Sequence, residues 1–159
     1  MKIIMELEVK NKKEAKLKYT FIKQLVKDLK IRLYKNIDRV DINKVEKAIL
    51  NFDVLWKTKT KPKEINGRKI LIDIINNITW YELDNNKFLI QINRMAKLEN
   101  SNTSLETIAK LIDYGSPGIL PMRYFSKYFE EFRGEAIHLW STYKEYNTKI
   151  KVKRLVTVR

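Results

Sequence analysis

The chain of 159 residues contains no cysteine and a single histidine, His138. It can therefore form no disulfide, no thiolate metal site and no histidine metal cluster. It also lacks a nucleophile elbow, a glycine-rich phosphate loop and any zinc-ligand spacing. Asp113 and the Glu130-Glu131 pair stand apart from any such motif, and we interpret them as charges on helix surfaces. We therefore expect no enzymatic activity, no metal and no cofactor.

Long apolar runs are missing as well. No stretch approaches the length needed to cross a bilayer, and Glu6 and Glu8 interrupt the layout of a secretory signal near the start. We therefore expect no membrane contact and an intracellular place of assembly. The length suits one domain, residues 1–159, which is large enough to bury a core.

Positive charge is abundant and uneven. The formal net charge is +14. Residues 1–35 carry eleven basic and four acidic side chains, and residues 57–69 and 144–159 each carry six basic and one acidic. The rest of the chain is slightly acidic. Such basic blocks attract nucleic acid, an acidic membrane or an acidic protein surface without distinguishing among them.

The apolar pattern predicts an α+β fold. Alternation predicts strands near residues 3–9 and 150–158, and we interpret residues 79–83 and 88–92 as two more strands joined by a turn at Asp84-Asn85-Asn86. Helical spacing predicts two long helices, 12–35 and 125–146, and shorter ones near 42–56, 70–78 and 104–114. Asn11, Asp41 and Thr103 are expected helix caps. We expect an antiparallel sheet of about four strands packed against the two long helices. Gly134, inside the second of these, is expected to allow another element to approach closely.

Residues 57–69 are expected to form a basic arm. Lys57, Lys59, Lys61 and Lys63 alternate with small residues, and Pro62 excludes a regular helix. The segment predicts an exposed loop or extended arm, or else a short exposed strand that ends at the proline.

The most distinctive stretch is residues 107–125. Two of the three prolines and two of the four glycines of the chain lie in it. Gly115 is expected to end a helix in a left-handed conformation, where valine would be strained and asparagine tolerated better. Ser116, Pro117 and Gly118 predict a turn, and Pro121 a second corner.

This stretch resembles a motif of the tailed-bacteriophage neck or tail-completion proteins, which join heads to tails. The motif has an Ile-Ala helix, an acid-aromatic-Gly step, a small residue, a short loop and Pro-x-Arg-Pro-Phe. The matching residues are Ile108, Ala109, Asp113, Tyr114, Gly115, Ser116, Pro121, Arg123 and Phe125. Tyr124 stands where the family usually has a second proline. Gly67, Arg68 and Leu71 echo an upstream Gly-basic-x-Leu element of the family.

The resemblance implies a structural virion protein at the head–tail junction, assembled in the host cytoplasm. Its expected partners are further copies of itself in a ring, expected to be a hexamer, and the neighbouring connector and tail-tube or tail-terminator proteins, with non-specific contact with DNA besides. The expected contact residues are Tyr114, Gly115, Ser116, Pro121, Arg123, Tyr124 and Phe125, with Lys57, Lys59, Lys61 and Lys63 of the arm.

Other interpretations remain open. The stretch 107–125 could be an ordinary corner between two helices of any α+β domain. A basic nucleic-acid-binding protein would explain the charge directly, and Tyr and Trp side chains can stack on bases. The aromatics, however, follow the spacing of core residues and do not interleave with the lysines. A small enzyme or toxin is the third class.

Overall fold

The computed structural model describes the backbone of residues 1–115 and 120–157, and side chains as far as residue 147. In this part of the chain the order of elements is β1 (Lys2–Glu6), α1 (Lys12–Lys35), a short 3-10 helix η1 (Ile37–Arg39), α2 (Ile42–Asn51), α3 (Gly67–Asn76), β2 (Ile78–Asp84), β3 (Lys87–Ile92), α4 (Leu105–Tyr114) and α5 (Phe125–Thr157). The expected mixture of helices and antiparallel strands is confirmed.

The three described strands form one antiparallel sheet in the order β1-β3-β2. Met5 pairs with Phe88 and Ile3 with Ile90, so these buried side chains share one face. The hairpin between β2 and β3 turns at Asn85-Asn86, and Asn86 has a positive φ of 63°. The prediction of a tight hairpin at these asparagines is confirmed, since asparagine tolerates positive φ.

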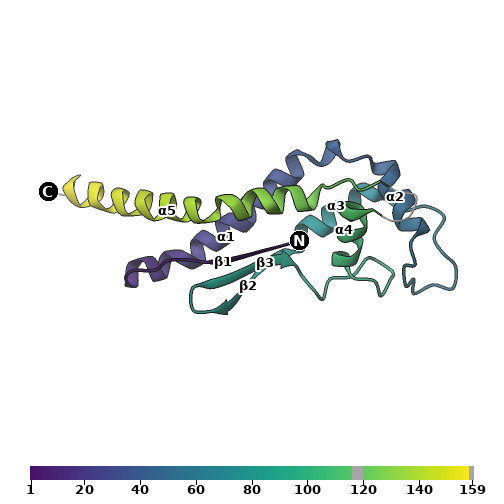
Figure 1. Ribbon diagram of the computed structural model, residues 1–159, viewed down its shortest axis with the longest axis horizontal. Helices are drawn as coiled ribbons and strands as arrows, with labels where there is room; N and C mark the ends of the chain where they lie inside the picture. Colours follow the sequence, from purple (N-terminus) through teal and green to yellow (C-terminus); the bar gives the residue numbers. More distant parts are fainter. Residues whose placement is uncertain (116–119, 158–159) are drawn as a thin grey trace.

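The two long helices pack against each other and against this sheet. Figure 1 shows α1 crossing α5 obliquely, with the sheet below α5 in this view, and the two helices are in contact. Phe21 of α1 meets Trp140 and Tyr143 of α5, with ring centroids 5.1 and 5.4 Å apart. The aromatic spacing of residues 125–143 is therefore core packing, as expected from its helical period.

Most of the helix starts follow from local side-chain caps. Asn11 accepts from the Glu14 N–H and Asp41 from the Lys44 N–H, as predicted. The prediction of Thr103 as the cap of α4 is wrong, because Ser104 accepts from the Thr107 N–H. The Thr103 hydroxyl instead accepts from the N–H of Leu55, 48 residues away in the sequence.

The predicted fourth strand is wrong. Helix α5 continues to Thr157, and residues 158–159 lie outside the described residues. A strand needs a neighbouring strand for its hydrogen bonds, whereas an existing helix gains one bond with each residue added. The alternation of apolar residues after residue 149 therefore did not decide the structure.

Two further expectations need correction. The basic arm is shorter than residues 57–69, because Gly67 begins α3; residues 57–66 contain no helix or strand. Gly134 does not admit a neighbour, since a Cβ placed on it would have no atom within 4 Å. In contrast, a Cβ on Gly67 would lie 2.8 Å from Glu46 Cγ and 3.3 Å from the Ile42 carbonyl oxygen, so this glycine permits α2 and α3 to touch.

Candidate functional site

The connection between α4 and α5, which we call the α4–α5 joint (described residues 112–115 and 120–126), is organised by Asp113. Its side chain is fully buried at the end of α4. One carboxylate oxygen accepts from the N–H groups of Tyr124 and Phe125, at 3.0 and 2.8 Å, and the other accepts from Ser126. Asp113 thus caps the N-terminus of a helix that begins twelve residues later. The negative charge also suits the positive end of the helix dipole.

The electrostatics of Asp113 reflect this position. Burial raises the pKa of the Asp113 carboxyl, and the N–H donors that favour its charged form lower it without cancelling the effect. The interpretation of Asp113 as helix-surface charge is therefore wrong. A carboxylate that is buried and fully used by backbone donors is placed for structure and not for proton transfer to a substrate.

The backbone of the joint has a positive φ at two described positions, Gly115 and Arg123. Gly115 has φ 75° and ψ −173°. The predicted positive φ is confirmed, but this ψ lies far from the left-handed helical value and in a region that only glycine readily occupies. Arg123 has a φ of 45°, unusual for a residue other than glycine. The N–H groups of Met122 and Arg123 donate to the carbonyl oxygens of Ile112 and Asp113, both at 3.2 Å, and hold this conformation.

The expected contact residues divide into two groups. Tyr114 is 56% exposed, and Pro121 and Arg123 are also exposed, so they are accessible to a partner. Tyr124 is 5% exposed and Phe125 is 0% exposed, which corrects their assignment as contacts. Ser116 lies outside the described residues.

The burial of Tyr124 and Phe125 has a specific cause. Tyr124 donates its phenol hydrogen to the carbonyl oxygen of Leu33 in α1, and its ring meets that of Phe125 edge-on, with centroids 4.8 Å apart. Burial is also the main reason why the pKa of Tyr124 is raised above its usual range. These two side chains attach the start of α5 to the core.

The shortened basic loop, residues 57–66, carries the four predicted lysines, and all four are exposed. Its base is fastened to the segment 98–104: Lys57 N–H donates to the Asn100 carbonyl and Asn102 N–H to the Leu55 carbonyl, both at 2.8 Å. The loop lies at the same end of the elongated molecule as the α4–α5 joint, away from the C-terminus (Figure 1). The structure thus places the two predicted contact regions at one end without joining them into one pocket.

Three further cations close to the joint were not singled out from the sequence. Arg39, Lys44 and Lys127 line a groove together with Arg123. Arg39 and Lys44 come from η1 and α2, and Lys127 comes from α5, more than 80 positions later in the sequence. These three residues lie outside the basic blocks 1–35, 57–69 and 144–159. The local charge pattern of the sequence therefore did not indicate this cluster.

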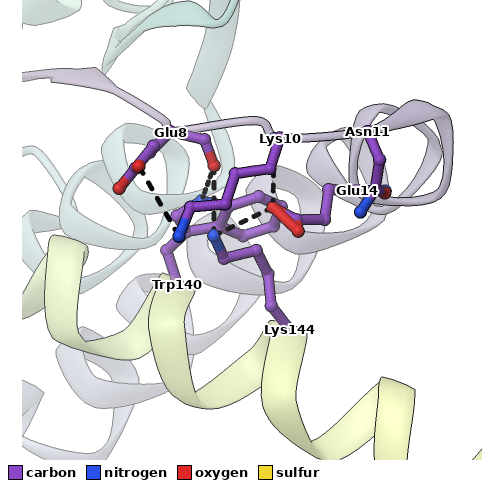
Figure 2. A network of polar contacts seen from close by, with 6 residues as sticks. All are labelled: Glu8, Lys10, Asn11, Glu14, Trp140 and Lys144. Atoms are coloured by element: carbon purple, nitrogen blue, oxygen red, sulfur yellow. Dashed lines mark hydrogen bonds and ion pairs between the residues drawn. The ribbon is translucent and has the colours of Figure 1, made fainter.

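A separate polar network fastens the chain between β1 and α1 to helix α5 (Figure 2). Lys144 Nζ lies 3.0 Å from Glu14 Oε1 and 3.2 Å from the Glu8 carbonyl oxygen, to which Trp140 also donates at 2.9 Å. Burial alone would raise the pKa of Glu14, but Lys144 and the Lys10 N–H together lower it below its ordinary value. The bonds from Trp140 and Lys144 thus join α5 to the start of α1 and to the chain that precedes it.

Within the described residues, no group of three or more potential ligands could hold a metal ion, and no helix is both long and apolar enough to cross a membrane. No family model, no curated protein and no solved structure matches the chain.

Proposed function

We propose that this protein is a structural subunit of the head–tail junction of a tailed-bacteriophage virion. It would be a neck or tail-completion protein, acting by protein–protein assembly and catalysing no reaction. The α4–α5 joint is the observation that carries the proposal. Asp113, Gly115 and Phe125, which match the family motif, each have a distinct part in building it.

A joint of this kind suits repeated docking. Its capped helix, glycine-only backbone step and buried aromatic anchor hold Tyr114 and Arg123 in a defined place on the surface. A subunit that must meet identical neighbours in the same way benefits from such preorganisation, because less freedom is lost on binding. By the resemblance, copies of the chain form a ring, expected to be a hexamer, since head-to-tail contacts can close into rings.

The ring would sit between the portal-side connector and the tail tube or tail terminator, in a particle assembled in the host cytoplasm. The direct test is to locate the protein in virions purified from the source of this sequence. We expect gold-labelled antibodies against it to mark the head–tail junction. Absence of the protein from intact virions, as measured by mass spectrometry, would end this proposal.

The basic loop is proposed to dock on an acidic neighbouring protein. Its lysines are exposed, and the loop itself contains no aromatic side chain for base stacking. Replacing Lys57, Lys59, Lys61 and Lys63 with serine should leave a folded protein that joins heads to tails poorly. The matched control replaces four exposed α1 lysines with glutamine and removes the same charge: Lys12, Lys13, Lys16 and Lys23. The control should support normal virion yield.

A nucleic-acid-binding protein is the second candidate, favoured by the net charge of +14. In that case the loop variant would lose tight DNA binding while virion yield stayed normal. The affinity of the unchanged protein for DNA would also fall steeply with salt, because each phosphate contact releases counterions. Weak, non-specific DNA binding together with failed assembly would support the head–tail proposal instead.

A further inference from the structure

The first turn of α5 forms one wall of a basic groove, and the segment from η1 to the start of α2 forms the other. The groove encloses about 300 Å³, and its lining includes Arg39, Lys44, Arg123 and Lys127. Asp41 is the only carboxylate in that lining. Its Oδ1 already accepts from the Lys44 N–H at 3.3 Å, as the cap of α2. Positive charge therefore exceeds negative charge clearly at this place.

Among the described residues, none of the four cations of this groove forms an ion pair, although Arg32, Arg68 and Lys144 do so elsewhere. Lys127 Nζ lies only over the ring of Tyr128, 5.4 Å from its centroid. Four like charges around one hollow repel one another, so an anionic ligand would bind favourably there.

The position of Arg123 strengthens the argument. Its φ of 45° is a cost for any residue other than glycine, and strained residues that the surrounding structure maintains tend to serve a function. A residue with a guanidinium, and not a glycine, thus occupies this position in the lining of the groove. A guanidinium binds a carboxylate through two parallel hydrogen bonds, a geometry that lysine cannot reproduce.

The surroundings favour a protein ligand over a nucleic acid. Arg123 and Lys127 also line the adjoining hollow, which includes Glu130 and Glu131. A phosphate backbone continuing past Arg123 would meet these two carboxylates and be repelled. A peptide can place acidic side chains in the basic groove and neutral or basic side chains beside Glu130. It can therefore match both the positive groove and the negative hollow next to it.

We propose that this groove binds an acidic segment of a partner protein, with carboxylates paired to Arg39, Lys44, Arg123 and Lys127. This proposal rests on the proposed function, which supplies the existence of a partner. It adds the chemistry of the partner's surface. It assigns a site to residues of η1, α2 and α5 and of the connection that leads into α5. It is also distinct from the basic loop, whose lysines do not line the groove.

The test measures binding of a fluorescein-labelled peptide in which glutamate alternates with glycine, by fluorescence anisotropy at physiological salt. The groove variant is Arg39→Gln with Lys44→Gln and Lys127→Gln. The matched control is Lys16→Gln with Lys23→Gln and Lys27→Gln, three exposed residues of α1 without ion pairs. We expect the groove variant to bind about tenfold more weakly, as three partly exposed ion pairs would give, and the control to bind as the unchanged protein does.

Arg123→Gly provides a second variant that does not depend on the first. Glycine accepts the positive φ, so the fold should be retained while the guanidinium is lost. We expect weaker peptide binding without a lower melting temperature.

Equal loss in the groove variant and the control would overturn the proposal, because the binding would then reflect net charge alone. So would a single-stranded oligonucleotide of the same charge that binds tighter than the peptide and depends on the same three residues. If the unchanged protein is found at the head–tail junction but does not bind the peptide, the groove proposal is refuted and the proposed function stands. If the protein binds the peptide through the groove but is absent from virions, the groove proposal stands and the proposed function is refuted.

Discussion

The backbone of Gly115 allows a sharp test of the α4–α5 joint. With φ 75° and ψ −173°, a Cβ atom at this position would crowd the neighbouring peptide groups. Holding a non-glycine residue there costs about 1–3 kcal/mol, against a total stability of about 5–15 kcal/mol for a typical domain. We therefore expect Gly115→Ala to lower the free energy of unfolding by about 1–3 kcal/mol. The melting temperature should fall by about 2–4 °C for each kcal/mol lost.

Asparagine separates this conformation from the ordinary left-handed helix end. Asparagine tolerates the left-handed region near ψ of about +47° better than other residues do, but ψ at Gly115 is −173°. Gly115→Asn should therefore be about as costly as Gly115→Ala. A clearly milder effect of asparagine would indicate the left-handed conformation that the sequence alone suggested.

Gly134 supplies the control, because it lies exposed in α5 with open space around it. Gly134→Ala should raise the free energy of unfolding by about 0.5–1 kcal/mol through helix propensity. The assay is urea unfolding followed by circular dichroism, with the unchanged protein and all three variants compared. The reasoning would fail if Gly115→Ala and Gly134→Ala shifted the midpoint in the same direction.

Three further changes probe the rest of the framework. Asp113→Ala should cost about 2–4 kcal/mol in urea unfolding, because it leaves buried N–H groups at the start of α5 without an acceptor; a loss below about 0.5 kcal/mol would show that water replaces the cap. Gly67→Ala should cost about 1–3 kcal/mol, since its Cβ would displace Glu46 and lose the 2.9 Å bond from the Gly67 N–H; an unchanged melting temperature would mean that α2 and α3 can separate freely. The pKa of Glu14 is lower in the folded protein than in the unfolded chain, so its contribution to stability is complete above the ordinary glutamate pKa and is lost as the pH falls through the lowered one. Glu14→Gln should therefore reduce the loss of stability on acidification, and parallel curves of stability against pH for the two proteins would contradict this.

Features that depend on near neighbours in the chain were predictable. The helical spacing of α1 reflects side chains that face the core, and the turn between β2 and β3 reflects the positive φ that asparagine tolerates. Asn11 and Asp41 cap helices through N–H groups only three residues away. The sequence also predicted an exposed, lysine-rich loop, because its lysine-rich part, residues 57–63, offers no large apolar side chain to bury.

The C-terminal segment shows where such reasoning fails. Alternating apolar residues predicted a strand after residue 149, yet α5 continues through this region. Alternation reports which side chains could share a face, but a strand also requires an edge with free hydrogen-bonding groups. Only the fold decides whether such an edge is offered.

The candidate site depended still more on tertiary structure. Asp113 is an ordinary acidic residue in the sequence, and it became the cap of α5 only when α4 was placed against that helix. Tyr124 and Phe125 belong to a motif that suggested surface contact, but they are buried because they anchor α5 beside α1. Arg39 and Arg123 lie 84 positions apart and meet in one groove. The local sequence pattern determines which face of an element is apolar. The tertiary structure decides which elements pack together. Burial, long-range hydrogen bonds and the clustering of charges all depend on that packing.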